Sequence, residues 1–204
     1  MPDAGRDLRL ATIAALVATA GDLGLLWASN APAFGLAPLS HAGLVAATLA
    51  GALAIPLYAL GYRAAACELP PPDRRVVVWL GVYGAALGAA VHLATGLIVH
   101  FERTAGGAPP DPYAAMAPYA VWLGPLWAVL AVVNAVASLR WARGVGRGTA
   151  GYPRTLRFVN PLAVVVAVSA LGAPFAWGRA FVVPAAPNVA HVVFFAALAA
   201  TRRS

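Results

Sequence analysis

Lysine is absent from this chain, cysteine occurs once, and charged residues of every kind are scarce. Only 10% of the 204 residues are charged, whereas 61% are hydrophobic and the mean hydropathy is +0.77. Because average soluble chains carry about a quarter charged residues, this composition excludes an ordinary soluble domain. The lone Cys67 excludes an internal disulfide, so cysteine usage leaves the redox compartment open.

Sequence motifs for nucleotides and metals are missing as well. The chain has no glycine-rich phosphate-binding loop, no cysteine cluster and no pair of histidines four residues apart. We therefore expect no metal site and no cofactor. The net charge of +7 would suit nucleic acid, but the arginines lie between apolar segments rather than along one face. Nucleic acid is therefore not an expected partner.

What the sequence has in abundance is apolar runs of membrane-spanning length. Runs of about 20 such residues need lipid as their solvent. The six candidate spans are 10–29, 41–63, 76–99, 117–139, 158–177 and 181–201. They predict an all-α, polytopic integral membrane bundle of six transmembrane helices, in which residues 1–204 form one domain.

The connections between these spans are short and rich in proline, glycine and arginine. Residues 67–75 are expected not to be helical through their three prolines, and 104–113 also break the helical pattern. Residues 140–154 are interpreted as a basic, glycine-rich loop.

Arginine placement predicts the orientation, because cytoplasmic loops keep arginine near the ends of spans. With both termini cytoplasmic, only Arg103 and Arg179 fall on the outer side. The inner side receives the other twelve: Arg6, Arg9, Arg63, Arg74, Arg75, Arg140, Arg143, Arg147, Arg154, Arg157, Arg202 and Arg203. Arg140 to Arg157 would also suit an anionic lipid headgroup, but orientation alone explains them. The alanine- and glycine-rich, lysine-free composition is typical of a high-GC bacterial gene, so we expect a multi-pass protein of the bacterial inner (plasma) membrane.

An alternative interpretation concerns the first span. Arg6 and Arg9 precede an apolar stretch that ends in Ala18-Thr19-Ala20, a pattern typical of signal-peptide cleavage. Against cleavage, the apolar run continues after Ala20 to a full span length. A continuous first span is the favoured interpretation, and cleavage stays open.

Polar residues inside spans are costly and mark the first place to look for chemistry. They are Asp22, Tyr58, Tyr83, His92, Asn134, Asn160, Asn188 and His191. At a rise of about 1.5 Å per residue, three spans place Asp22, His92, Asn188 and His191 in one layer that reaches from the midplane into the outer half. Trp122 and Trp127 fall in the same layer.

Asp22 admits two interpretations that the sequence leaves open. Gly21 and Gly24 beside it allow a helix or a ligand to approach closely. Burial disfavours the charged carboxylate, so Asp22 would serve as a protonated acid. It would equally serve as a helix-to-helix hydrogen-bond partner of Asn188 or a histidine.

Five stretches carry a resemblance to known membrane proteins: "GDLGLLW", "IPLYALGYRAA", "GAAVHL", "YPRTLRFVNPL" and "PNVAHVVFF". They resemble an uncharacterised family of small bacterial polytopic membrane proteins, over most of the chain except 100–140. The matching positions are Asp22, His92, Tyr152, Pro153, Arg154, Asn160, Pro161, Asn188 and His191. In size and span count the chain also resembles the integral membrane terpene cyclases, which implies an intramembrane carboxylic acid as proton donor.

Three hypotheses about function follow. The first is an enzyme that cyclises or isomerises an isoprenoid-like lipid, with Asp22 as acid and His92 and His191 as relay or orienting groups. Its substrate-binding residues would be Asn188 and Tyr58, with Trp122 and Trp127 stabilising positive charge through their aromatic faces. The second is a protein that binds a lipid, a quinone or another lipophilic small molecule without turnover. The third is haem-based electron transfer, since histidines on facing helices can ligate iron.

Overall fold

The computed structural model describes residues 3–104, 117–148 and 150–201, and every regular element among them is a helix. The α-helices are α1 (Ala4–Asn30), α2 (His41–Ala54), α3 (Tyr58–Ala66), α4 (Pro71–Thr104), α6 (Ala120–Gly146), α7 (Pro161–Gly172) and α8 (Val183–Thr201). Short 3₁₀ segments are η1 (Ala31–Phe34), η2 (Ile55–Leu57), η3 (Ala117–Tyr119) and η4 (Arg154–Phe158), and η5 (Gly178–Val182) is a π-helical segment.

Five helical segments are long and apolar enough to cross a membrane: Ala4–Phe34, His41–Ala66, Pro71–Thr104, Ala117–Gly146 and Gly178–Thr201. They correspond to five of the six expected spans and support a multi-pass membrane bundle. The sixth, expected over 158–177, is realised only as the 12-residue apolar helix α7. At about 1.5 Å per residue α7 is about 18 Å long, which is shorter than the hydrocarbon core of a bilayer.

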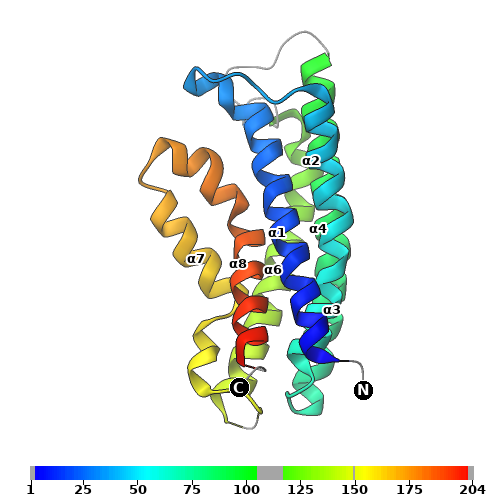
Figure 1. Cartoon of the computed structure of the whole chain (residues 1–204), viewed down its shortest axis with the longest axis vertical. Coiled ribbons are helices and arrows are strands. Elements are labelled where there is room, and N and C mark those ends of the chain that lie inside the picture. Colours follow the sequence, from blue (N-terminus) through cyan, green and yellow to red (C-terminus); the bar gives the residue numbers. More distant parts are fainter. Residues whose placement is uncertain (1–2, 105–116, 149, 202–204) are drawn as a thin grey trace.

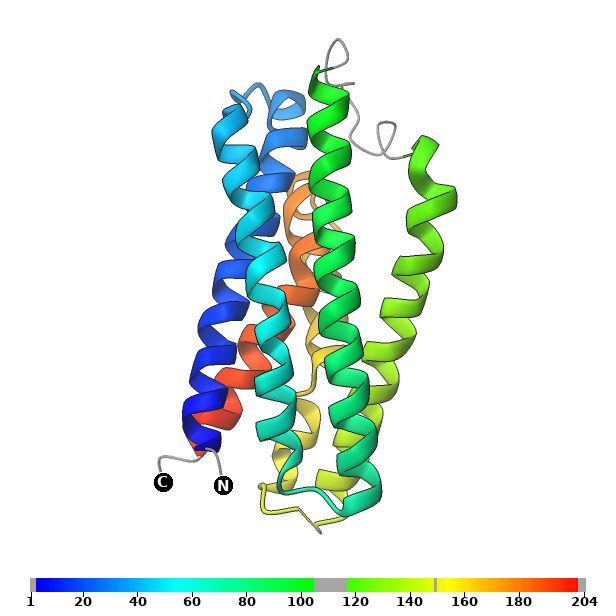
Figure 2. The same ribbon diagram turned by 90° about the vertical axis from the view of Figure 1, so that its right-hand side faces the viewer.

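The long helices run along one axis and bring the two ends of the chain together. In Figures 1 and 2, α1, α4, α6 and the α2–α3 pair extend over most of the length, while α7 and α8 form a shorter hairpin. Helix α1 packs against α2, α3 and α8, and α4 packs against α2, α3 and α6. The start of α1 and the end of α8 lie at the same end of the molecule (Figure 1).

That end also carries most of the arginines. The described residues of the predicted inner set all lie there (Figure 1): in the first two turns of α1 and α4, the last turn of α3, the last two turns and C-cap of α6, and η4. Arg103 and Arg179 lie at the opposite end, in the last turn of α4 and in η5. Arg202 and Arg203 lie outside the described residues.

Two of the expected connections were wrong in part. Pro71 and Pro72 lie in the first turn of α4. Backbone N–H groups of a first turn have no acceptor within the helix, so a proline there removes no helical hydrogen bond. Helix α6 continues to Gly146, so the first half of 140–154 is helical rather than a loop. The expected break at 104–113 lies, apart from Thr104, outside the described residues.

Pro184 and Pro187 lie in the last span, where the sequence predicts a kink or a delayed start of the helix, and a π-helical segment precedes α8 there. Pro184 has no N–H to offer the carbonyl of Ala180, and the chain widens to π geometry over η5. The freed Ala180 carbonyl accepts a hydrogen bond from Nδ2 of Asn30 at 2.6 Å. Because Asn30 is the last residue of α1 and is buried, this bond ties α1 to the top of α8.

Replacing Asn30 by alanine should lower the free energy of unfolding by about 1 kcal/mol, because the Ala180 carbonyl then has neither Pro184 nor Asn30 as donor. Thermal unfolding of the purified protein in detergent measures the change. Thr19→Ala is the matched control, since the Thr19 hydroxyl bonds only to the Ala15 carbonyl of its own helix. Equal losses in the two variants would contradict this role for Asn30.

Candidate functional site

A cavity of about 130 Å³ lies between α1, α3, α4, α6 and α8. Its lining is largely apolar, with Leu25, Ile55, Val91 and Leu130 among its walls. Polar side chains reach it from five helices: Asp22, Tyr58, Tyr62, His92, Thr95, Asn134, Asn188 and His191. The polar residues therefore meet at one apolar cavity rather than at separate helix contacts.

Asp22 is the centre of the first polar group. Its Oδ1 lies 2.9 Å from Nδ1 of His92, and its Oδ2 accepts a hydrogen bond from Nδ2 of Asn188 at 2.6 Å. The Asn188 carbonyl oxygen in turn accepts from the hydroxyl of Tyr58 at 2.7 Å. These three bonds connect α1, α4, α8 and the start of α3. The expected partners of Asp22, Asn188 and a histidine, are both in place.

Glycines on α1 and α2 make the approach of His92 possible. A Cβ on Gly51 would occupy the space taken by the His92 ring, so the absence of a side chain lets that ring pack directly against the backbone of α2. A Cβ on Gly21 would lie 2.8 Å from the carbonyl oxygen of Ala47, too close for an unstrained contact. Small residues therefore bring α1, α2 and α4 close enough for Asp22 and His92 to bond.

The hydrogen bonds around His92 restrict where protons can lie. Nε2 of His92 lies 3.3 Å from the Ala47 carbonyl, which only accepts, so Nε2 carries a hydrogen. The contact between Nδ1 and Asp22 then has one shared proton, on the carboxyl or on the ring. Both arrangements satisfy every hydrogen-bonding atom of the pair, so the proton can cross without any other group moving.

A second polar group lies on the same cavity and is built on His191. Nδ1 of His191 donates to the Pro187 carbonyl at 2.7 Å, so Nε2 accepts from the hydroxyl of Tyr62 at 2.9 Å. Tyr58 stacks on the His191 ring with centroids 4.5 Å apart and an interplanar angle of 25°. Tyr58 thus contacts both groups, through its ring to His191 and through its hydroxyl to Asn188.

Six of the seven site residues expected from the sequence line this cavity: Asp22, Tyr58, His92, Trp127, Asn188 and His191. Trp122 does not; it is 76% exposed and turned away. The reason is helical geometry, because residues five apart point about 140° away from each other. Trp127 lines the cavity and is also 43% exposed, which places it at the cavity's edge.

Sequence reasoning missed Tyr62. It lies four residues after Tyr58, and this spacing puts both tyrosines on one helix face, so the signal was present in the sequence. Asn134 also lines the cavity, 3.5 Å from the Tyr62 hydroxyl. Asn160, by contrast, accepts from the Ala163 N–H as the N-cap of α7 and lies away from the cavity.

Metal or haem ligation fits these residues poorly. Over residues 3–104, 117–148 and 150–201, no three His, Cys, Asp or Glu side chains group closely enough to hold an ion. Both ring nitrogens of His92 and of His191 already have protein partners. Axial ligation by either ring would require breaking one of these bonds.

Comparison of the chain with protein-family models, with curated proteins and with solved structures finds no match. The resemblances to the small bacterial membrane family and to the membrane terpene cyclases therefore stay predictions. What this site does has to be argued from its own geometry.

Introducing a methyl group at Gly51 should displace His92 and separate it from Asp22. We expect Gly51→Ala to lower the free energy of unfolding by about 1 to 3 kcal/mol, a typical cost of overpacking. Gly124→Ala is the control, because a Cβ there meets nothing within 4 Å. Thermal unfolding in detergent compares the two, and a Gly51→Ala protein as stable as the control would show that His92 does not need this space.

Proposed function

We propose that the protein is an integral membrane enzyme that isomerises or cyclises an apolar, isoprenoid-like substrate after protonating it. The observation that carries this proposal is the pairing of Asp22 with His92 at the wall of an apolar cavity between apolar helices. An acid at that place can deliver a proton to a molecule that dissolves only in lipid. The terpene-cyclase likeness points the same way as an analogy.

The hydrogen bonds of the lining favour a hydrocarbon over a quinone. Among the described residues, the buried side-chain nitrogen and oxygen atoms without a partner are Nδ1 of His100 and Nε1 of Trp141, and neither residue lines the cavity. The buried polar groups of the lining already bond to the protein, so quinone carbonyls would have to compete for them. An unfunctionalised alkene chain makes no such demand.

The reaction we propose begins with a protonated Asp22. The carboxyl proton forms a new C–H bond with one carbon of a double bond, and the other carbon becomes a cation. The carboxylate left behind accepts from Nδ2 of Asn188, and the pair of Asp22 and His92 regains its shared proton when the proton taken up later at His191 returns to it. The ring faces of Tyr58 and Trp127 stabilise the cation.

The second polar group offers an exit for a proton. The oxygen of Tyr62 takes a proton from a carbon next to the cation while its own proton moves to Nε2 of His191, 2.9 Å away. One proton enters and one leaves, so the product is an isomer of the substrate. This series of reaction steps consumes no oxidant, reductant or cofactor. His191 and His92 act as relays, and Asn188 is a positioning residue.

The membrane arrangement belongs to the same proposal. With the arginine-rich end in the cytoplasm, both termini are cytoplasmic. Helix α7, which leads away from that end, then belongs to a sixth crossing that is shorter than the others. The bacterial inner membrane is the location that the composition favours. The cavity then lies within the bilayer, and Trp127, which lines it and is 43% exposed, lies at its edge.

Asp22→Asn should reduce turnover by at least about 100-fold, the usual contribution of a general acid. The assay incubates the protein in nanodiscs with a panel of linear polyprene hydrocarbons and polyprene epoxides. Products are analysed by mass spectrometry, and they should have the substrate's mass in H₂O and one added deuterium in D₂O. Asp7→Asn is the matched control: it is the same change on the same helix, but Asp7 pairs with Arg63 at the arginine-rich end.

Three outcomes would overturn the proposal. If Asp22→Asn converts a substrate as fast as the unmodified protein, Asp22 is not the acid. If the unmodified protein binds members of the panel in its cavity and converts none, the protein is a lipophile-binding protein without turnover. Product that contains no solvent deuterium would exclude protonation as the first step.

A further inference from the structure

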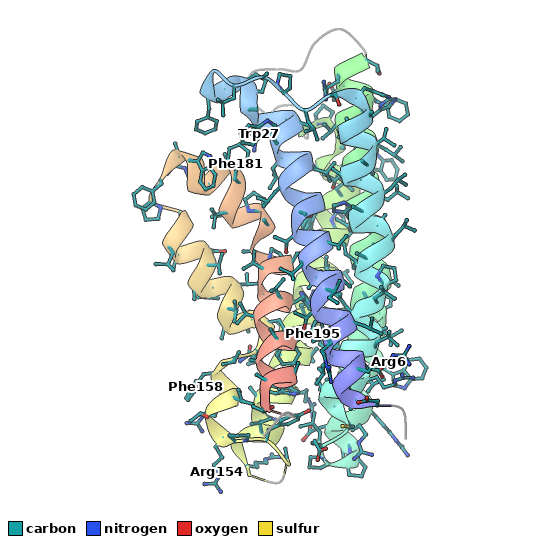
Figure 3. All side chains as sticks on the ribbon, in the orientation of Figure 1. Arg6, Trp27, Arg154, Phe158, Phe181 and Phe195 are labelled. Atoms are coloured by element: carbon teal, nitrogen blue, oxygen red, sulfur yellow. The ribbon has the colours of Figure 1, made fainter. Side chains whose placement is uncertain are left out.

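One part of the sequence that the proposed enzyme does not use is "YPRTLRFVN", which contains η4 and ends at Asn160, the N-cap of α7. This segment lies at the arginine-rich end of the molecule, where Figure 3 shows Arg154 and Phe158 projecting from the fold. In the sequence, membrane orientation alone accounts for the arginines of this segment. The structure adds that they converge with the end of α6.

Two guanidinium side chains fold back onto the C-terminal end of α6. Nε and Nη2 of Arg154 both lie 2.7 Å from the position that a Cβ on Gly148 would occupy. The Cδ atom of Arg157 lies 3.4 Å from the corresponding position on Gly146. Gly148 has a φ of 68°, a left-handed conformation that favours glycine, and it leaves this surface open for Arg154.

The positive charge of this cluster is only partly balanced. Arg140 and Arg147 lie 3.7 and 3.9 Å from the buried carboxylate of Asp73, which is shared between them. Neither Arg154 nor Arg157 pairs with a carboxylate of any described residue. Arginine side chains that no described carboxylate balances are suited to binding phosphate oxygens.

An exposed aromatic ring beside the arginines indicates the source of the phosphate. Phe158 is 65% exposed, and the Cζ atom of Arg157 lies 4.5 Å above its ring. Three residues later α7 begins, and α7 is apolar from its first turn. The arginines therefore lie at headgroup depth, with an aromatic side chain at the membrane interface. A free phosphate ion has no apolar part that could pack against this ring.

We propose that Arg154, Arg157 and Phe158 form a binding site for the headgroup of an anionic phospholipid in the leaflet at the arginine-rich end. The two guanidiniums bind the lipid phosphate, and Phe158 packs against the upper part of the acyl chains. This site is independent of the chemistry at Asp22.

The test titrates the full-length protein in detergent with dioleoylphosphatidylglycerol and follows the unfolding temperature, from which an apparent dissociation constant is obtained. We expect phosphatidylglycerol to raise the unfolding temperature and the zwitterionic dioleoylphosphatidylcholine to leave it nearly unchanged. The double variant Arg154→Gln/Arg157→Gln should bind phosphatidylglycerol at least about tenfold more weakly. Phe158→Ala should weaken binding without a change of charge.

Arg6→Gln/Arg9→Gln is the matched control, because it removes two charges from the same end of the molecule but from α1 (Figure 3). It should bind phosphatidylglycerol as the unmodified protein does. Equal weakening in the two double variants would overturn the proposal in favour of a diffuse charge effect. Stabilisation by inorganic phosphate equal to that by the lipid would overturn the lipid assignment. If the double variant does not fold, the single variants Arg154→Gln and Arg157→Gln decide the question by the same titration.

Discussion

The hydrogen bonds of the Asp22 carboxyl are the interaction on which the arrangement of the helices depends. A carboxyl group between apolar helices has no water to bond, so both of its oxygens must find partners within the protein. They find them on two other helices, in His92 of α4 and Asn188 of α8. The position of one acidic residue thus fixes the distance between α1, α4 and α8 and leaves an apolar cavity beside them.

The last helix meets the same demand with its backbone. Pro184 has no N–H for the carbonyl of Ala180, which accepts instead from Asn30, and the carbonyl of Pro187 accepts from Nδ1 of His191. The bond to Pro187 also decides which nitrogen of His191 accepts from Tyr62. Backbone carbonyls of this last segment therefore hold two buried side chains in place, and one of them, His191, lines the cavity.

Much of this could be predicted from residue patterns, because lipid imposes strong rules. Apolar runs predicted the long helices, arginine placement predicted the gathering of positive charge at one end, and the depth of Asp22 and His92 predicted a shared layer. What the sequence could not provide was which faces meet. Trp122 and Trp127 share a depth, yet only Trp127 lines the cavity. The length of α7 was also missed, since the apolar run over 158–177 does not reveal that the helix ends at Gly172 after 12 residues.

The central claim is that Asp22 holds a proton beside the cavity and shares it with His92. Infrared spectroscopy of the protein in lipid measures this directly, because a protonated carboxyl group and an ionised carboxylate absorb at different frequencies. The account predicts a protonated carboxyl band, under the conditions of the turnover assay, that shifts in D₂O, disappears in Asp22→Asn and remains in Asp7→Asn. If Asp22 contributed only ionised carboxylate bands under the same conditions, it would not be the resting proton donor, and the account would be contradicted.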